Sequence, residues 1–219
     1  MPKVLVAISS CQSFEASGLN DPMRETWLTA LPQGWGYKFF HGRGAQSKHD
    51  VVVLDVDDGM GGLTEKAKAK ARWAIANEYD YIFSCFPDTY ANAERLAATG
   101  FENYDYMGNV YKFPNANSYF CQGGPGYFMS RKACVYLVNN TMSYLNDDTF
   151  IGDTLNRADI LRCDDRRFTM CGPGPLKTNE SVTNHLSTQP GGFTGQNMRE
   201  EHKRWLESLS ESPSSALLI

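Results

Sequence analysis

Two groups of aspartates stand where their carboxylates could take part in chemistry. Asp88 follows the apolar run Tyr81-Ile-Phe-Ser-Cys85 and the turn-forming Pro87, so its side chain is expected to project from the edge of a sheet. A carboxylate in that place could bind Mn²⁺ or Mg²⁺, although an isolated aspartate after a strand commonly serves only as a turn residue. Asp147 and Asp148 stand at the expected start of a helix. There a carboxylate could accept the proton of a hydroxyl group, or it could simply cap the helix.

Small and polar residues elsewhere could help to bind a ligand. Ser9 and Ser10 end an apolar run that is expected to form a buried strand, and ligands of open α/β sheets bind at such carboxyl ends. The guanidinium group of Arg24 suits a diphosphate or carboxylate partner, unless Arg24 is an ordinary surface residue of a helix. Gly123 and Gly124 open a Gly-Gly-Pro-Gly segment, whose spacing is not that of a dinucleotide-binding loop. Residues without a Cβ would let a ligand approach the backbone closely, and a tight turn is the alternative reason for them.

These residues must be positioned by segments whose patterns alternate between strand and helix. Short apolar runs predict strands over residues 4–9, 37–41, 50–55, 81–83, 106–111 and 126–129. Capping residues and runs of strong helix formers predict helices over residues 20–28, 64–77, 92–99, 131–139 and 198–209. The alternation predicts one α/β domain over residues 1–209, with a mixed, mostly parallel sheet flanked by helices. Residues 210–219 are expected to form a flexible tail.

The predicted helix over residues 64–77 begins with alternating lysines, Lys66, Lys68 and Lys70. Residues at alternate positions do not share one face of a helix, because neighbours on a face lie three or four residues apart. The alternation therefore favours a solvated helix over a stripe that binds phosphate.

The bulk composition limits the class of protein. With 219 residues, 42% of them hydrophobic, the chain can bury one sizeable core. A net charge of −4, from 21 basic and 25 acidic residues, argues against a dedicated nucleic-acid-binding protein but leaves a local basic patch open. We recognise neither a signal sequence nor a membrane-spanning run, so we expect a cytoplasmic protein that does not bind membranes. Its six cysteines form no CxxC pair and are expected to be reduced thiols, most of them buried like small hydrophobic residues.

Four segments are informative together rather than singly. The first joins Val4-Leu-Val-Ala-Ile-Ser-Ser10 to Met23-Arg-Glu-Thr-Trp27, and the second is Gly62-Leu-Thr-Glu-Lys66. The third runs from Asp80 to Asn92, and the fourth couples residues 123–130 to residues 146–152. In this order and spacing they resemble the β-1,3-galactosyltransferase and Fringe-like glycosyltransferases. The resemblance spans residues 4–152 and implies a glycosyltransferase-A fold.

The resemblance implies transfer of a sugar from a nucleotide sugar, UDP-linked by analogy, to a hydroxyl group of a glycan acceptor, with inversion at the anomeric carbon. Asp148 matches the acid that takes the proton of the acceptor, and Asp147 is its supporting neighbour. Asp88 and His185 would hold Mn²⁺ or Mg²⁺, because the family places a metal-binding histidine after its acidic catalytic segment. An ordinary loop histidine is the alternative for His185. The residues implied to line the nucleotide sugar are Ser9, Ser10, Arg24, Lys66, Asp88, Gly123 and Gly124.

The chain also departs from the family pattern. Phe86 and Pro87 stand where the family carries two further acids, so weak metal binding is expected. Their presence leaves a noncatalytic module that binds a sugar nucleotide or a glycan as an alternative function. Animal members of the family are membrane-anchored, whereas this chain begins at its first strand, which favours either a bacterial, viral or phage enzyme in the bacterial or host cytoplasm or an excised domain. A phage enzyme could instead glycosylate a hydroxymethylated DNA base.

Overall fold

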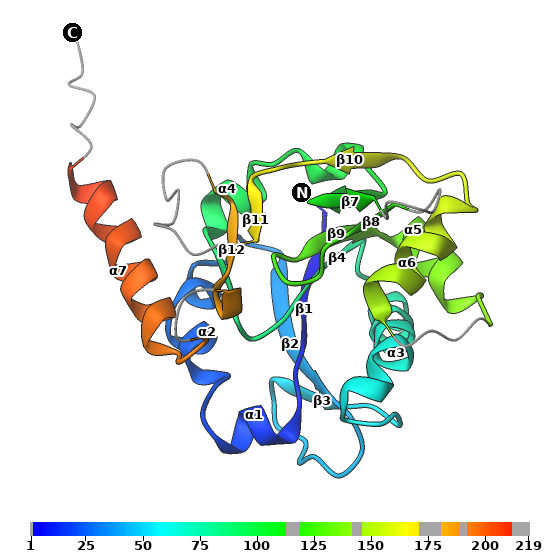
Figure 1. The fold of residues 1–219 in the computed structure, drawn as a ribbon, viewed down its shortest axis with the longest axis horizontal. Helices are drawn as coiled ribbons and strands as arrows, with labels where there is room; N and C mark the ends of the chain where they lie inside the picture. The colour runs from blue at the N-terminus through cyan, green and yellow to red at the C-terminus, as the bar shows by residue number, and fades with distance from the viewer. Residues whose placement is uncertain (1, 113–118, 142–145, 171–180, 189–191, 212–219) are drawn as a thin grey trace, which may run out of the picture.

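The computed structural model describes residues 2–112, 119–141, 146–170, 181–188 and 192–211. At its centre lies a seven-stranded sheet (Figure 1). Its strands are, in spatial order, β10 (Arg162–Asp164), β6 (Tyr106–Gly108), β9 (Tyr127–Ser130), β4 (Tyr81–Cys85), β1 (Val4–Ser9), β2 (Trp35–His41) and β3 (Val51–Val53). β1 pairs in parallel with β2 and β4, whereas β9 runs antiparallel to β4 and β6. The prediction of a mixed, mostly parallel sheet is confirmed.

The middle of the sheet defines the edge at which a ligand can bind. β1 is buried along its whole length, as a continuous apolar run in a parallel sheet should be when both faces are covered. Because β1, β2 and β4 are parallel, their carboxyl ends, Ser9, His41 and Cys85, meet at one edge. Ligands of open α/β sheets bind beyond this edge.

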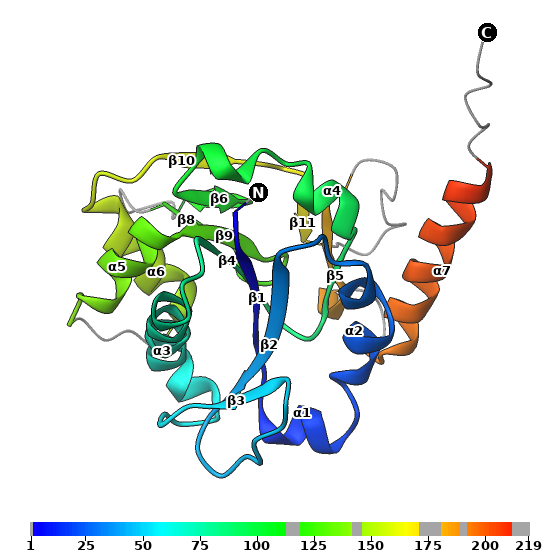
Figure 2. The same cartoon turned by 180° about the vertical axis from the view of Figure 1, so that it is seen from behind.

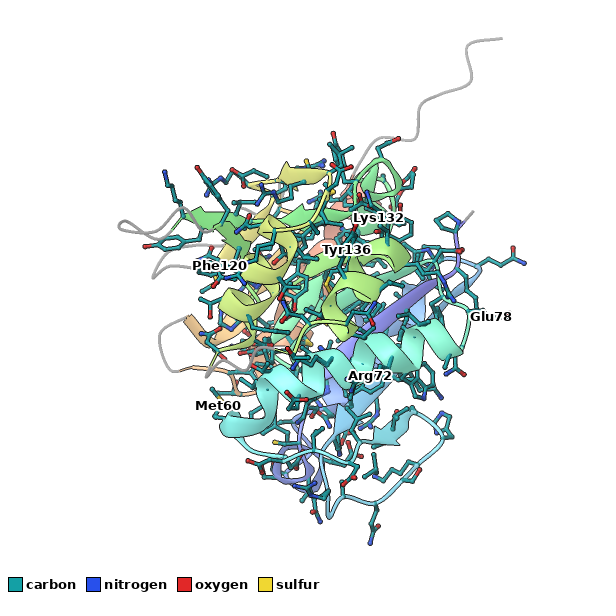
Figure 3. All side chains as sticks on the ribbon, turned by 90° about the vertical axis from the view of Figure 1, so that its right-hand side faces the viewer. Met60, Arg72, Glu78, Phe120, Lys132 and Tyr136 are labelled. Atoms are coloured by element: carbon teal, nitrogen blue, oxygen red, sulfur yellow. The ribbon has the colours of Figure 1, made fainter. Side chains whose placement is uncertain are left out.

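Helices cover both faces of the sheet, as the opposite views in Figures 1 and 2 show. Alternate residues of β1 face opposite sides, so Val6 and Ile8 belong to one hydrophobic cluster and Leu5 and Ala7 to the other. The helices that pack on the Val6 side are α2 (Asp21–Glu25), α4 (Ala93–Ala97) and α7 (Gln196–Glu211). Those on the Leu5 side are α3 (Leu63–Ala76), α5 (Arg131–Val138) and α6 (Asp147–Asn156). Figure 3 looks onto this second group, where the exposed side chains of Arg72 and Tyr136 mark α3 and α5.

Two smaller sheets complete the described part of the chain. β5 (Thr89–Ala91) begins directly after Asp88 and pairs antiparallel with β12 (Thr183–His185). β12 also pairs in parallel with β11 (Phe168–Met170). A separate antiparallel pair consists of β7 (Val110–Lys112) and β8 (Tyr119–Cys121). The pairing of β5 with β12 carries a distant part of the sequence to the end of β4.

Most predicted segments are confirmed as elements with slightly different ends. The predicted strand over 106–111 is divided between β6 and β7, which belong to different sheets. The predicted helix over 20–28 is divided between α2 and a 3-10 turn (Trp27–Ala30), because Thr26 leaves helical geometry with φ −116° and ψ −117°. The last helix continues past residue 209 to Glu211, and residues 212–219 of the predicted tail lie outside the described residues.

The interpretation of the α3 lysines as solvated is wrong. Lys66, Lys68 and Lys70 are only 2%, 4% and 2% exposed. Lys66 and Lys70 are four residues apart and therefore share a helical face. Their ammonium groups reach Ser10 and Ser9 at the carboxyl end of β1. The four-residue spacing of Lys66 and Lys70 was therefore the informative pattern, and it was overlooked because Lys68 makes the three lysines alternate.

Two further expectations concern cysteine chemistry and membranes. The cysteines at 11, 85, 121, 134 and 163 are free thiols, and Cys171 lies outside the described residues. Cys85, Cys121 and Cys134 are buried, which confirms their prediction as small core residues. Burial raises the pKa of Cys134 to about 12, so this thiol is chemically inert. Within the described ranges, no helix has both the length and the apolar character needed to cross a membrane.

Candidate functional site

A cleft of about 460 Å³ lies beyond the carboxyl ends of β1 and β4. Its walls come from the end of β1 with α1 (Gln12–Ala16), from the start of α3, and from the segments around β5 and β12. This is the place where a sheet of this kind binds ligands, and the volume suits a small molecule. The predicted site residues that line it are Ser9, Ser10, Lys66, Asp88, Gly124 and His185.

Asp88 and His185 lie side by side on one wall of the cleft. The antiparallel pairing of β5 with β12 sets His185 opposite Thr89, the residue after Asp88. His185 Nε2 and Asp88 Oδ2 are 2.9 Å apart, and Ser187 Oγ donates a hydrogen bond to the same carboxylate oxygen. The side chains of His185 and Asp88 are 16% and 14% exposed. The structure therefore brings together the two residues predicted to bind a metal ion.

Gly123 and Gly124 separate this pair from Asp148. A Cβ on Gly123 would lie 2.5 Å from Asp148 Oδ1, and a Cβ on Gly124 would lie 2.6 Å from His185 Nδ1. Real Cβ atoms do not approach other atoms so closely, so only glycine at both positions lets the carboxylate and the imidazole pack against the same loop. The glycines thus serve close packing of site side chains, a reason that the sequence alone did not give.

Asp148 lies at the start of α6, but it does not cap that helix. The N-cap is Asn146, whose side-chain oxygen accepts a hydrogen bond from Asp148 N at 2.9 Å. The Asp148 carboxylate instead accepts a hydrogen bond through Oδ2 from Gly123 N, also at 2.9 Å. Burial, together with the charge of Asp147, raises the pKa of Asp148 to about 7. A carboxyl group with such a pKa can take up and release a proton near neutral pH.

Asp147 is the more deeply buried member of the acidic pair. It is 4% exposed, and burial raises its pKa, while the charge of Lys70 favours its ionised form. The two aspartates interact electrostatically, so they titrate as a coupled pair and not as two independent groups. The placement of Asp147 fits a neighbour that adjusts the charge around Asp148.

Lys66 lines the cleft, where hydrogen bonds hold its ammonium group. Its Nζ donates hydrogen bonds to Ser10 O at 2.6 Å and to Asp58 Oδ1 at 3.2 Å. The Asp58 carboxylate also accepts hydrogen bonds from the backbone N–H groups of Gln12 and Gly42. Although burial opposes the change, these bonds and the charge of Lys66 lower the pKa of Asp58. Asp58 was missed at the level of sequence, where Asp57-Asp58-Gly59 has the composition of a simple turn.

The expectation that Arg24 faces a nucleotide does not fit its position. Its guanidinium group pairs with Glu15 at 2.9 Å, Asp21 at 2.8 Å and Asp50 at 2.7 Å, and it lies over the ring of Phe39. Arg24 is not among the residues that line the cleft. Three carboxylates each accept a hydrogen bond from Arg24, so its guanidinium group links α1, α2 and the residue before β3 at a place outside the cleft lining.

The side chains of Asp88 and His185 fit a divalent cation whose remaining ligands come from outside the protein. Asp88 Oδ1 is buried and accepts no hydrogen bond from the described residues. A carboxylate beside an imidazole is a donor set that suits Mn²⁺. Within the described ranges, no cluster of three or more His, Cys, Asp and Glu side chains is arranged to hold a metal ion. Asp88 and His185 would therefore supply two ligands, and phosphate oxygens and water would have to supply the others.

The comparisons with known proteins show similarity in fold only. No family model matches the sequence, and no curated protein matches it. The structure is similar to that of the inositol-1-phosphate CTP transferase from T. maritima, with a TM-score of 0.54 and 9% identity over 92% of this chain and 96% of that chain. A weaker similarity, to A197 from STIV, has a TM-score of 0.42 and 10% identity over 74% of this chain and 80% of that chain. The similarity to the T. maritima structure extends over almost the whole chain and supports the mixed α/β arrangement.

Proposed function

We propose that this chain is a glycosyltransferase of the glycosyltransferase-A type, which transfers a sugar from a nucleotide sugar to a hydroxyl group of a glycan. One observation carries the proposal: the Asp88–His185 pair lines the cleft and packs against Gly124, and Asp148, which is not itself a lining residue, packs against the neighbouring Gly123. This arrangement offers a base for the acceptor next to a place for the phosphates of the donor. The Fringe-like resemblance of residues 4–152 supports the same reaction, and the observed fold is compatible with a transferase that uses a nucleotide.

In the proposed reaction, Asp148 takes the proton of the acceptor hydroxyl group while the hydroxyl oxygen forms a bond to the anomeric carbon of the donor. The bond from that carbon to the phosphate oxygen breaks, and the nucleoside diphosphate leaves with the electron pair. Attack from the opposite side inverts the anomeric configuration. Gly123 N–H holds Oδ2 of Asp148, whereas Oδ1 accepts no hydrogen bond from the described residues. We therefore assign the proton to Oδ1.

The donor side of the site combines a protein cation with a place for a metal ion. Lys66 lines the cleft beside Ser10 and brings a positive charge toward the phosphates. A divalent cation held by Asp88 and His185 would neutralise the negative charge of the leaving diphosphate. UDP is the proposed nucleotide, and Ser9, Ser10, Gly123 and Gly124 are proposed to contact the donor.

A donor assay tests the proposed function directly. The purified chain is incubated with a panel of UDP-hexoses and Mn²⁺, and UDP release is measured with and without glycan acceptors. Release that depends on a glycan supports the proposal. UDP release that depends on DNA with hydroxymethylated bases would show that the acceptor is DNA rather than a glycan, while the proposed type of reaction would stand. UDP binding without release under any of these conditions would identify a noncatalytic binding module.

A second candidate function is transfer of a nucleotidyl group, which the fold similarity to a CTP transferase over 92% of this chain favours. In that reaction a phosphate oxygen of the acceptor attacks the α-phosphate of CTP, and pyrophosphate leaves. The two reactions therefore differ in their products. Pyrophosphate release from CTP in the presence of a sugar phosphate, without UDP release from any UDP-hexose, would contradict the glycosyltransferase proposal.

The transfer rate is expected to rise with pH and to level off above about pH 7. Asp148 must be ionised to accept a proton, and its pKa is raised to about 7. At pH 5 the ionised fraction, and with it the rate, should be about 100-fold below the plateau. The measurement is kcat/KM between pH 5 and pH 9, with a thermal melt at each pH to confirm folding. A midpoint near pH 4, the ordinary value for aspartate, would remove Asp148 as the base.

A further inference from the structure

Lys70 is a buried charge that the proposed reaction does not use. It lies on α3 one turn after Lys66 and is 2% exposed. Its Nζ donates hydrogen bonds to Ser9 Oγ at 2.5 Å and to Ser84 Oγ at 2.8 Å. These serines stand near the carboxyl ends of β1 and β4, which are adjacent parallel strands. One ammonium group therefore joins the two strands that end at the cleft.

The acidic pair of α6 supplies negative charge that favours the charged form of Lys70. Burying an ammonium group is costly unless hydrogen bonds or an opposite charge offset the loss of water. No ion pair to Lys70 is found among the described residues, but the charges of Asp147 and Asp148 favour its charged form, while that of Lys66 opposes it. Burial lowers the pKa of Lys70 to about 8. α3 packs against α6, so the buried cation and the buried acids lie on neighbouring helices.

We propose that Lys70 is a positioning residue of the same site, which fixes Ser9 and Ser84 and balances the negative charge of Asp147 beside the catalytic base. The inference rests on the proposed function. Through Ser9 the ammonium group reaches the donor side of the cleft, and through Asp147 it acts on the acceptor side. A neutral side chain at this position leaves the acidic pair without its buried countercharge.

A double-mutant cycle on stability tests the charge balance without reference to any reaction. The variants are Lys70→Met, Asp147→Asn and the double variant, each measured by thermal melting at pH 7. The double variant removes both charges, so its Tm should lie at least about 2 °C above the value that the two single shifts predict when added. Additive shifts would overturn the proposal. If Lys70→Met alone fails to fold, folding of the double variant supports the charge balance and failure of both contradicts it.

Turnover provides the second readout. Lys70→Met is expected to lower kcat for sugar transfer about tenfold or more, with a smaller change in the KM of the donor, and Asp147→Asn in the same chain should restore part of kcat. Lys68→Met is the matched control, because Lys68 is equally buried on α3 but pairs with Glu65 and lies over Phe150. An unchanged kcat in folded Lys70→Met, or an equal loss in Lys68→Met, would overturn the positioning role. If the wild-type chain transfers no sugar at all, the proposed function fails and the stability cycle still decides the charge balance.

Discussion

Replacing Asp148 by asparagine is expected to lower the rate of sugar transfer by roughly 10²–10⁴-fold, the usual contribution of a positioned acid or base. Asparagine has almost the same shape as aspartate, so the hydrogen bond from Gly123 N can persist, but an amide cannot accept the proton of the acceptor. The affinity for UDP should therefore stay close to the wild-type value. The measurements are kcat from UDP release and the dissociation constant of UDP from calorimetry.

Asp147→Asn is the matched control for this prediction. Asp147 adjusts the charge around the base without taking the proton, so its replacement should cost much less turnover than that of Asp148. If the two variants exchange behaviours, the base is Asp147 and the assignment is wrong by one residue. If both retain nearly normal turnover, neither aspartate is the base. Helix capping cannot account for a loss in either variant, because the cap of α6 is Asn146.

The stability of the Asp148→Asn variant has a predictable dependence on pH. A carboxyl group whose pKa is raised in the folded state contributes stability below its unfolded pKa, near 3.9, and loses it as the pH rises through the folded value of about 7. At pH 8 the wild-type chain therefore holds an unfavourable buried carboxylate that asparagine removes. The variant should melt at the same temperature as the wild type or higher at pH 8, so lost activity there would not reflect unfolding.

The sequence predicts six of the seven strands of the main sheet, because local patterns mark them, but it missed the short edge strand β10. The apolar run of β1 and the run of β4 have the length and composition of buried parallel strands, and each is followed by residues that cannot continue them. The helix formers of α3 are equally clear. These patterns also locate the carboxyl edge of the sheet, where Ser9, Ser10 and Asp88 were expected and are found.

The remaining parts of the site depend on contacts between distant residues, which no local pattern reports. His185 reaches Asp88 only because β12 pairs with β5, and its prediction came from a family resemblance rather than from its own neighbours. Arg24 carries the same local signal whether its partner is a phosphate or a carboxylate, and here its partners include Glu15 and Asp50. The burial of Lys70 was hidden because lysine is normally a surface residue and its partners lie on two other strands.

Removal of divalent cations is expected to weaken UDP binding about tenfold or more, since the diphosphate would then lose its metal ligand as well as charge neutralisation. Asp88→Asn should have the same effect in the presence of Mn²⁺, because it removes the negative charge of a ligand while keeping the shape of the side chain. Its affinity for UDP should then be equal in Mn²⁺ and in EDTA. Calorimetry of both proteins under both conditions measures the four affinities.

Ser187→Ala is the control, because Ser187 contacts the same carboxylate without being an expected ligand. This variant should keep most of its dependence on Mn²⁺, whereas His185→Ala should lose it together with Asp88→Asn. Lys66→Met should weaken UDP binding by a similar factor in Mn²⁺ and in EDTA, because its charge belongs to the protein and not to the cation. The prediction is contradicted if the wild-type chain has the same affinity for UDP in Mn²⁺ and in EDTA, because the site would then be independent of metal ions. Lys66 would then carry the neutralisation alone, and Asp88 would serve only to hold His185 against the Gly123-Gly124 loop.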